Sequence, residues 1–251
     1  MGQPGEAQRL TNLPVSGCWS ADGAGDIDTA LTEVLTQLYP PFVSTVLGPL
    51  DDRPSSYPEE RRLVGAATVQ RQREFFGGRA CAHAALRALG VGAGPIGIGG
   101  HREPLWPPNV VGSISHAGTV AGAAVARVCD AWGIGLDIEP LEPPLSGEVE
   151  RIVEASSDPP PGSDGHPLDS YRTKVAFSAK ECVFKCLYPG TGWLLDFSDV
   201  SVTVDLEGAR FAAAVSARFL APGLDLTALV GGLAVCDGYV VTALCIPAHP
   251  G

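Results

Sequence analysis

Two helix-forming segments, residues 58–90 and 171–188, constrain the fold of this chain more than any other feature of the sequence. Pro58 and the two glutamates that follow it suit the first turn of a helix, where a missing N–H and negative charge are both tolerated. The first segment ends at Gly90, and Pro189-Gly190 closes the second. The two segments lie in different halves of the chain, so each half has its own helix.

Short runs of β-forming residues accompany each helical segment. The expected strands cover residues 111–115, 120–128, 132–139, 200–206, 211–217, 231–236 and 239–246. Asp237-Gly238 is typical of a two-residue hairpin turn, whereas Gly77-Gly78 interrupts the first helical pattern. We therefore expect an α+β fold in which a helix packs on mostly antiparallel strands in each half.

Three segments are expected to be irregular. Residues 1–25 are polar and rich in glycine, which is typical of a loose chain end. The sequence GVGAGPIGIGG (90–100) predicts a glycine-rich loop. Seven of the 28 residues from 140 to 167 are proline, so we predict a mobile surface loop there.

The composition excludes several classes of protein. With 45% apolar and 18% charged residues in 251, the chain can bury a core and is not a disordered polymer. No run approaches the roughly 18 apolar residues of a membrane span, and the N-terminus lacks the apolar stretch of a secretion signal. None of the seven cysteines forms a C-x-x-C pair, so we expect buried reduced thiols in a cytoplasmic protein.

The charge is distributed unevenly along the chain. The net charge is −11, yet residues 53–102 hold eight arginines and three glutamates. A basic segment in an acidic protein indicates one localised anionic ligand, and nucleic-acid binding is not expected.

Two short motifs resemble known sites but lack the required context. Residues 92–97 read G-x-G-x-x-G, but a helix precedes them where a dinucleotide fingerprint needs a strand. Residues 112–116 (GSISH) lack the G-x-S-x-G pattern of a hydrolase nucleophile. Ser115 and His116, at a strand end, could still contact a phosphate group.

Two acidic residues lie two positions apart in one of the expected strands. Asp137 and Glu139 project from the same face because side chains alternate along a strand. Such a pair suits a hard cation, but a solvated edge strand explains it equally well.

The second helix carries a matching polar stripe. At 100° per residue, Lys174, Ser178, Glu181 and Lys185 share one face, opposite an apolar stripe. Glu181 and Lys185 are either an ordinary i,i+4 pair in solvent or part of a magnesium–phosphate site. Spacing alone leaves both interpretations open.

Four segments together resemble the 4′-phosphopantetheinyl transferases of the larger, single-chain class, and in particular the subgroup of enterobactin synthase component D. They are QRQREFFGGRACAHAAL (70–86), REPLWPPNVVGSISH (102–116), GIGLDIEP (133–140) and FSAKECVFK (177–185). The last two match the family signatures G-[IVL]-D-x-E and [WF]-[SA]-x-K-E-x-x-x-K. Phe177 stands where many members have tryptophan.

The resemblance implies an activity and a set of site residues. The family transfers 4′-phosphopantetheine from coenzyme A to a serine of an acyl or peptidyl carrier protein and releases adenosine 3′,5′-bisphosphate. By this resemblance Asp137, Glu139 and Glu181 hold Mg²⁺ or Mn²⁺, and Asp137, Glu181 and Lys185 carry the chemistry. The residues implied to contact coenzyme A are Arg71, Arg79, Arg102, Ser115, His116, Lys180 and Lys185.

The resemblance also implies a pseudodimer of two similar halves, which we place at residues 1–128 and 129–251. A pseudodimer supplies both halves of its site, so we expect a monomer. The proline-rich insertion at 155–167 lies where the family contacts carrier proteins. Two alternatives remain, a non-catalytic module that binds coenzyme A or a carrier, and a metal-dependent hydrolase of nucleotide diphosphates.

Overall fold

The computed structural model describes residues 27–50, 53–92, 94–155, 168, 171–219 and 224–248. The expected loose chain end at 1–25 and the insertion at 155–167 lie almost wholly outside these residues. The helices are α1 (Ile27–Gln37), α2 (Pro58–Val64), α3 (Val69–Ala88), α4 (Gly147–Ala155), α5 (Arg172–Thr191) and the short 3-10 helix η2 (Phe197–Asp199). None of the helices in the described ranges is long and apolar enough to cross a membrane.

The strands form three antiparallel sheets. They are β1 (Ser44–Pro49), β2 (Gly97–Ile98), β3 (Pro104–Leu105), β4 (Val110–Ala117), β5 (Val120–Arg127), β6 (Ala131–Pro140), β7 (Val200–Asp205), β8 (Arg210–Val215), β9 (Leu229–Cys236) and β10 (Tyr239–Pro247). The N-terminal half contributes a sheet of order β1-β5-β4, and the C-terminal half one of order β6-β10-β9-β8-β7. The expected α+β fold with antiparallel sheets is confirmed.

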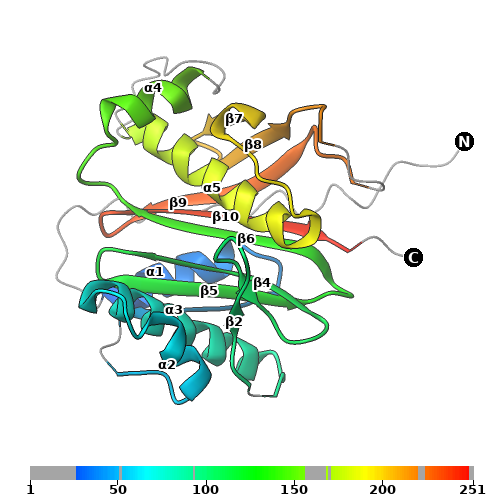
Figure 1. The fold of residues 1–251 in the computed structure, drawn as a ribbon. Coiled ribbons are helices and arrows are strands. Elements are labelled where there is room, and N and C mark those ends of the chain that lie inside the picture. The colour runs from blue at the N-terminus through cyan, green and yellow to red at the C-terminus, as the bar shows by residue number, and fades with distance from the viewer. Residues whose placement is uncertain are drawn as a thin grey trace, which may run out of the picture.

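Each large sheet carries one long helix, and the two sheets meet at β4 and β6 (Figure 1). Helix α3 packs on β5, β1 and β4, whereas α5 packs on β6, β10 and β7. The two halves therefore repeat the same layered arrangement of a helix on a sheet. Strands β4 and β6 bring the polar residues of both halves to one junction.

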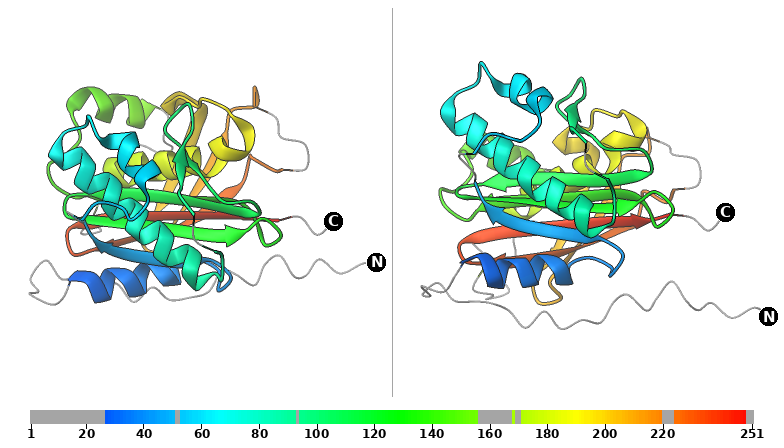
Figure 2. Two further views of the ribbon diagram at one scale, coloured as in Figure 1. Left: turned by 60° about the horizontal axis from the view of Figure 1, so that its bottom comes forward. Right: turned by 90° about the horizontal axis from the view of Figure 1, so that it is seen from below.

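Alternate residues of β5 enter two different cores, so helices α1 and α3 cover opposite faces of the first sheet (Figure 2). Ala121 and Ala123 pack with Ala82 of α3. Ala124 packs with Leu31 of α1, in a core that also holds residues of β6 and β10. This second core joins the halves, while α5 covers a third one against the five-stranded sheet.

The sequence pattern predicted a break in the first helical segment at Gly77-Gly78. The structure instead has the break at residues 65–68, between α2 and α3. Thr68 caps α3, its hydroxyl accepting a hydrogen bond from the Arg71 N–H at 3.3 Å. Helix α3 then continues through both glycines. A Cβ at Gly78 would lie 2.8 Å from Ile114 Cγ2, so this glycine lets α3 lie close to β4.

The remaining differences from the expected elements are local. Helix α4 occupies part of the predicted proline-rich loop, and α1 and β1 have no counterpart in the sequence-based prediction. The glycine-rich loop contains β2, which pairs with β3. Helix α5 continues through Pro189 and ends at Thr191, and the residue that caps it, Gly192, has a left-handed φ of 70°.

Candidate functional site

The carboxylate of Asp137 is the centre of a buried polar cluster between the two halves. Asp137 is only 2% exposed. Its Oδ1 accepts hydrogen bonds from Ser115 Oγ of β4 at 3.1 Å and from Lys185 Nζ of α5 at 2.5 Å. Its Oδ2 accepts one from Ser178 Oγ at 2.8 Å. Three segments far apart in the sequence thus converge on one carboxylate.

Two glycines let α5 lie close enough to β6 for this convergence. A Cβ at Gly135 would lie 2.2 Å from the Cys182 carbonyl oxygen, and one at Gly133 would lie 2.7 Å from that of Cys186. Real Cβ contacts are not this short, so any side chain here would push the helix away from the strand. The G-x-G spacing before Asp137 is therefore a packing requirement of the site.

Lys185 is a cation held by its carboxylate partner. Burial alone would lower the pKa of Lys185, but Asp137 raises it above its ordinary value. The ammonium also donates a hydrogen bond to Ser115 Oγ at 3.2 Å. Lys185 therefore stays charged and links Asp137 of one half with Ser115 of the other.

Glu139 and Glu181 are carboxyl groups in an environment short of positive charge. Burial, followed by the charge of Asp137, raises the pKa of Glu139 to about 7. Burial also raises the pKa of Glu181, and Lys185 only partly offsets this effect. Within the described ranges, no three His, Cys, Asp or Glu side chains lie together as a ready-made metal site.

A second polar group lies on the α3 side of β4. The Nε2 atom of His116 lies 2.9 Å from Arg71 Nη1, and Arg71 pairs with Glu74 at 3.2 Å. A guanidinium only donates hydrogen bonds, so His116 Nε2 accepts and the ring is neutral in this arrangement. Burial is the main reason that the pKa of His116 is lowered.

Two predicted site residues, Arg79 and Arg102, lie apart from the Asp137 cluster. Arg79 is 5% exposed, with Nη2 donating to the Gly97 carbonyl at 2.9 Å and the guanidinium 4.6 Å from the centre of the Phe75 ring. Its Nε has no hydrogen-bond partner among the residues that the structure describes, and burial lowers the pKa of Arg79 to about 10. Arg102 lies exposed in the turn between β2 and β3, with a left-handed φ of 71°.

The ammonium of Lys180, which we expect near the phosphates, contacts the segment that follows α5. It donates hydrogen bonds to the backbone carbonyls of Phe197, at 2.9 Å, and Val200. Burial lowers the pKa of Lys180 to about 8. In this arrangement Lys180 anchors the segment that follows α5.

Sequence reasoning missed the site role of Ser178, Thr242 and Glu74. Ser178 was placed on the polar stripe of α5, but its hydrogen bond to Asp137 could not be seen from spacing. Thr242 is a single polar residue in the apolar strand β10, and this was the available signal. Glu74 lies one turn after Arg71 on α3, the usual spacing of a helical ion pair.

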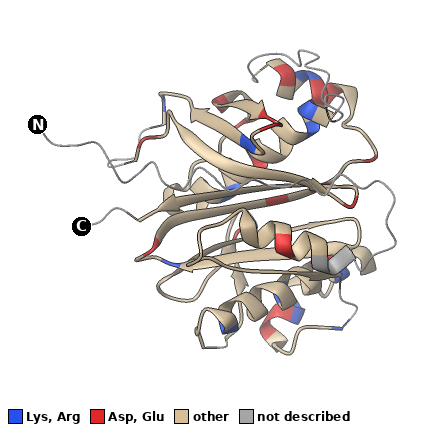
Figure 3. Cartoon of the chain, turned by 180° about the vertical axis from the view of Figure 1, so that it is seen from behind, with Lys and Arg blue, Asp and Glu red and all other residues tan. Residues whose placement is uncertain are grey.

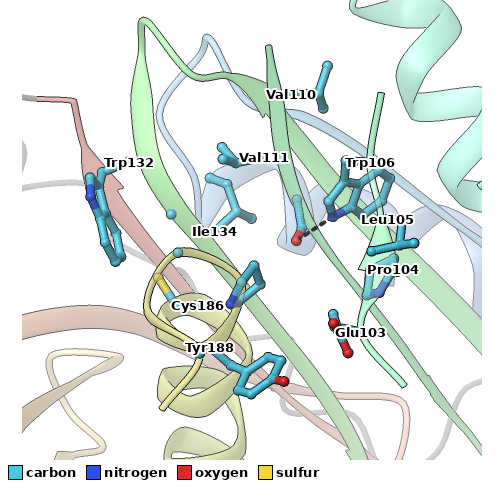
Figure 4. A pocket seen from close by; sticks show the side chains of 15 residues that line it. Glu103, Pro104, Leu105, Trp106, Val110, Val111, Trp132, Ile134, Cys186 and Tyr188 are labelled. Atoms are coloured by element: carbon cyan, nitrogen blue, oxygen red, sulfur yellow. Dashed lines mark hydrogen bonds between the residues drawn. The ribbon is translucent and has the colours of Figure 1, made fainter. Parts of the chain in front are cut away.

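Two cavities flank the C-terminal part of α5. The larger, about 360 Å³, lies under the β2–β3 hairpin, where Trp106 Nε1 donates to the Gly112 carbonyl (Figure 4). The residues labelled there are Glu103, Pro104, Leu105, Trp106, Val110, Val111, Trp132, Ile134, Cys186 and Tyr188. The smaller, about 200 Å³, is lined by Lys180, Glu181, Phe184, Leu195, Asp196, Phe197 and Val200.

Most of the described cysteines are buried, and charged residues are distributed over the whole fold. Cys81, Cys182, Cys186 and Cys236 are buried as expected, whereas Cys129 is exposed. Basic and acidic positions both occur in each half (Figure 3).

Comparison with known proteins gives matches to both halves. Residues 59–126 match the family of the 4′-phosphopantetheinyl transferase N-terminal domain. Residues 133–242 match the 4′-phosphopantetheinyl transferase superfamily. The second match contains Asp137, Glu139, Glu181 and Lys185.

Curated relatives cover most of the chain. The sequence is 39% identical over 202 residues to the 4′-phosphopantetheinyl transferase Svp of Streptomyces mobaraensis, covering 78% of this chain and 80% of the relative. It is 32% identical over 195 residues to the 4′-phosphopantetheinyl transferase PptT of Mycobacterium tuberculosis, covering 74% and 84%. It is 33% identical over 186 residues to enterobactin synthase component D of Escherichia coli, covering 68% and 88%. Because these relatives are covered over more than two thirds of their length, the chain belongs to the 4′-phosphopantetheinyl transferase superfamily and is a transferase.

Proposed function

We propose that this protein transfers the 4′-phosphopantetheine arm of coenzyme A to a serine hydroxyl of an acyl or peptidyl carrier protein. The reaction depends on Mg²⁺ or Mn²⁺ and releases adenosine 3′,5′-bisphosphate. The observation that carries the proposal is the convergence of Asp137, Ser115 and Lys185 at the junction of the two halves. The names of the relatives support the reaction class.

The donor set around Asp137 suits a divalent cation. Asp137 pairs with Lys185, Glu139 and Glu181 each interact electrostatically with both of these groups, and burial raises the pKa of both glutamates. Hard cations prefer such carboxylate oxygens, and positive charge here would relieve the repulsion between them. Asp137, Glu139 and Glu181 would hold the metal, which when bound supplies charge to neutralise the diphosphate of coenzyme A.

The protein's own cations would bind and orient the phosphate groups. Lys185 is held charged beside Ser115, where a diphosphate oxygen can accept its one remaining N–H donor. His116 and Arg71 lie on the face of β4 opposite to Ser115, because side chains alternate along a strand, and supply donors for a further phosphate. Arg79 and Arg102 complete the basic segment, Arg79 from a buried position beneath it and Arg102 from the hairpin.

Glu181 is the group that we assign as the base, directly or through a water molecule. Glu181 interacts electrostatically with the Asp137–Lys185 pair, and a cation bound to its carboxylate would make it a weaker base and favour the route through water. The carrier serine oxygen bonds to the β-phosphorus of coenzyme A as the bond to the bridging oxygen breaks. Adenosine 3′,5′-bisphosphate leaves with that oxygen, and Glu181 accepts the serine proton.

The smaller cavity supports the placement of the transferred group. It is lined by the charged residues Lys180, Glu181 and Asp196 and by the apolar residues Phe184, Leu195, Phe197 and Val200. A cavity of about 200 Å³ with polar and apolar walls suits part of the pantetheine arm, which carries amide groups on a flexible chain.

The intact mass of an apo carrier protein after incubation with this protein, coenzyme A and Mg²⁺ tests the proposal. We expect a gain of one phosphopantetheine group that EDTA abolishes. Release of phosphopantetheine without a carrier would instead identify a hydrolase. Coenzyme A binding without any mass gain across several carrier types would identify a non-catalytic binding module.

A further inference from the structure

We propose that Thr242 and Ser178 form a hydroxyl relay that positions the carboxylate of Asp137, an inference that rests on the proposed function. Neither residue belongs to the site residues identified from the sequence. Both are fully buried, and each comes from a different element of the C-terminal half.

The direction of the relay follows from the number of protons available. Asp137 is ion-paired with Lys185 and, as a carboxylate, only accepts hydrogen bonds. The single hydroxyl proton of Ser178 is therefore donated to Asp137 Oδ2, at 2.8 Å. Ser178 Oγ also lies 2.8 Å from Thr242 Oγ1, so Thr242 must be the donor in that contact.

The relay is anchored in the backbone of the sheet. Thr242 and Asp137 are register partners in the antiparallel pair of β10 and β6, and Ser178 reaches both from α5. Strand pairing thus sets the distance between Thr242 and Asp137, and the helix supplies the hydroxyl that joins them. A carboxylate offers about four acceptor sites, and Ser115, Lys185 and Ser178 take up three of them.

The consequence is a carboxylate with a fixed orientation. Without the Ser178 bond, Asp137 could rotate about its side chain and present either oxygen to Lys185. The relay holds Oδ2 toward Ser178, while Ser115 and Lys185 hold Oδ1, so that the remaining acceptor capacity keeps one direction. Groups that orient a ligating carboxylate in this way influence metal affinity about 10- to 100-fold.

Four variants test the relay. Thr242→Val removes the hydroxyl with little change in shape, Thr242→Ser restores it, and Ser178→Ala removes the middle link. Ser113→Ala is the matched control, because Ser113 is equally buried in the same junction but bonds to the Leu136 carbonyl.

Two measurements are made on each variant after thermal unfolding has shown that it is folded. The first is the Mg²⁺ concentration that gives half-maximal coenzyme A binding in calorimetry, which needs no turnover. The second is kcat and KM for transfer to an apo carrier. We expect Thr242→Val and Ser178→Ala to raise the half-saturating Mg²⁺ concentration about tenfold and to lower kcat while KM for the carrier is unchanged. Thr242→Ser and Ser113→Ala should match the wild type.

The outcomes separate this inference from the proposed function. If Thr242→Val and Ser178→Ala behave like Ser113→Ala in calorimetry, or if Thr242→Ser fails to restore what Thr242→Val loses, the relay is wrong. If the wild type transfers nothing to any carrier, the proposed function is wrong, and the calorimetric comparison still decides on the relay. Should Thr242→Val fail to fold, Ser178→Ala decides alone.

Discussion

At the scale of single residues, the site combines one carboxylate that accepts several hydrogen bonds with two carboxyl groups in a buried environment. Asp137 accepts hydrogen bonds from two hydroxyls and an ammonium. Burial raises the pKa of Glu139 and Glu181 instead. Asp137 is therefore held in one orientation by its partners, and we assign proton transfer to Glu181.

Replacing Glu181 by Gln should lower kcat about 100-fold or more, because a general base contributes 10²- to 10⁴-fold. The fold should be unaffected, since a neutral amide removes the cost of burying a charge. Single-turnover transfer to an apo carrier measures the rate, and thermal unfolding measures stability. A variant with nearly the full rate would remove Glu181 from the mechanism.

Arg71 and Arg79 should respond differently to replacement by alanine. Arg71 is partly exposed, so its loss should raise KM for coenzyme A with unchanged stability. Arg79 is buried against Gly97 and Phe75, so its loss should also destabilise the protein by about 1–3 kcal/mol. Calorimetric coenzyme A binding and urea unfolding are the measurements. Equal unfolding midpoints for the two variants would contradict the structural role of Arg79.

At the scale of elements, buried polar anchors and close glycine contacts hold the helices in place. Glu60 of α2 is fully buried and accepts hydrogen bonds from His83 of α3, at 2.8 Å, and from the Ile96 N–H, at 2.7 Å. Ser55 is a third donor. This one carboxylate joins α2, α3 and the segment that leads to the β2–β3 hairpin.

Glu60→Gln should destabilise the protein by about 1–3 kcal/mol at pH 7, because an amide cannot accept all three hydrogen bonds. Burial would raise the pKa of Glu60, but the bonds from His83, Ile96 and Ser55 lower it overall.

The pH dependence of this effect has a defined sign. A lowered folded-state pKa means that the stabilisation is complete above the unfolded-state value and is lost as the pH falls through the folded-state value. The gap in free energy of unfolding between wild type and Glu60→Gln should therefore shrink below pH 4.5. Urea titrations from pH 3 to pH 7 measure it, and a constant gap would exclude ionised Glu60 as the cause.

Gly135→Ala should displace α5 from β6, because its Cβ would lie 2.2 Å from the Cys182 carbonyl oxygen. We expect a loss of about 1–3 kcal/mol in stability together with loss of transfer activity, since the Asp137–Lys185 contact spans the same interface. Gly147→Ala at the start of α4 is the matched control, because a Cβ there meets nothing within 4 Å. Both variants are compared by thermal unfolding and carrier transfer. Equal melting temperatures would contradict the packing argument.

At the scale of the whole molecule, the halves share a core. Leu31 and Leu35 of α1 belong to the same buried cluster as Ile134 and Leu136 of β6 and Val241 of β10. Neither half can expose these residues without losing apolar burial. The division that we propose at residue 128 falls between β5 and β6, and we expect the two halves to fold together because they share this core.

The chain should consequently unfold in one cooperative transition. Urea unfolding followed by far-UV circular dichroism and by tryptophan fluorescence should give the same midpoint, because the described tryptophans, Trp106, Trp132 and Trp193, lie in both halves. Two separate midpoints would show that the shared core does not couple the halves.

Local patterns in the sequence were sufficient for most of the elements and for part of the site. Periodicities of 3.6 and 2 residues predicted the long helices and the common face of Asp137 and Glu139. The turn residues Asp237-Gly238 predicted the last hairpin. Helix α1 was missed because it lies beside the polar terminal segment, and α4 because the prolines around it favour a loop.

The α+β class, the family signatures and the set of charged groups could be predicted from the amino-acid sequence alone, because each depends on residues that lie close together in the chain. Which of these groups contact one another could be seen only in the folded structure. In the folded chain Lys185 pairs with Asp137, Lys180 donates hydrogen bonds to backbone carbonyls, and Thr242 forms a hydrogen bond with Ser178. These contacts depend on strand register and on the close approach of α5 to β6, which are set by packing between distant segments.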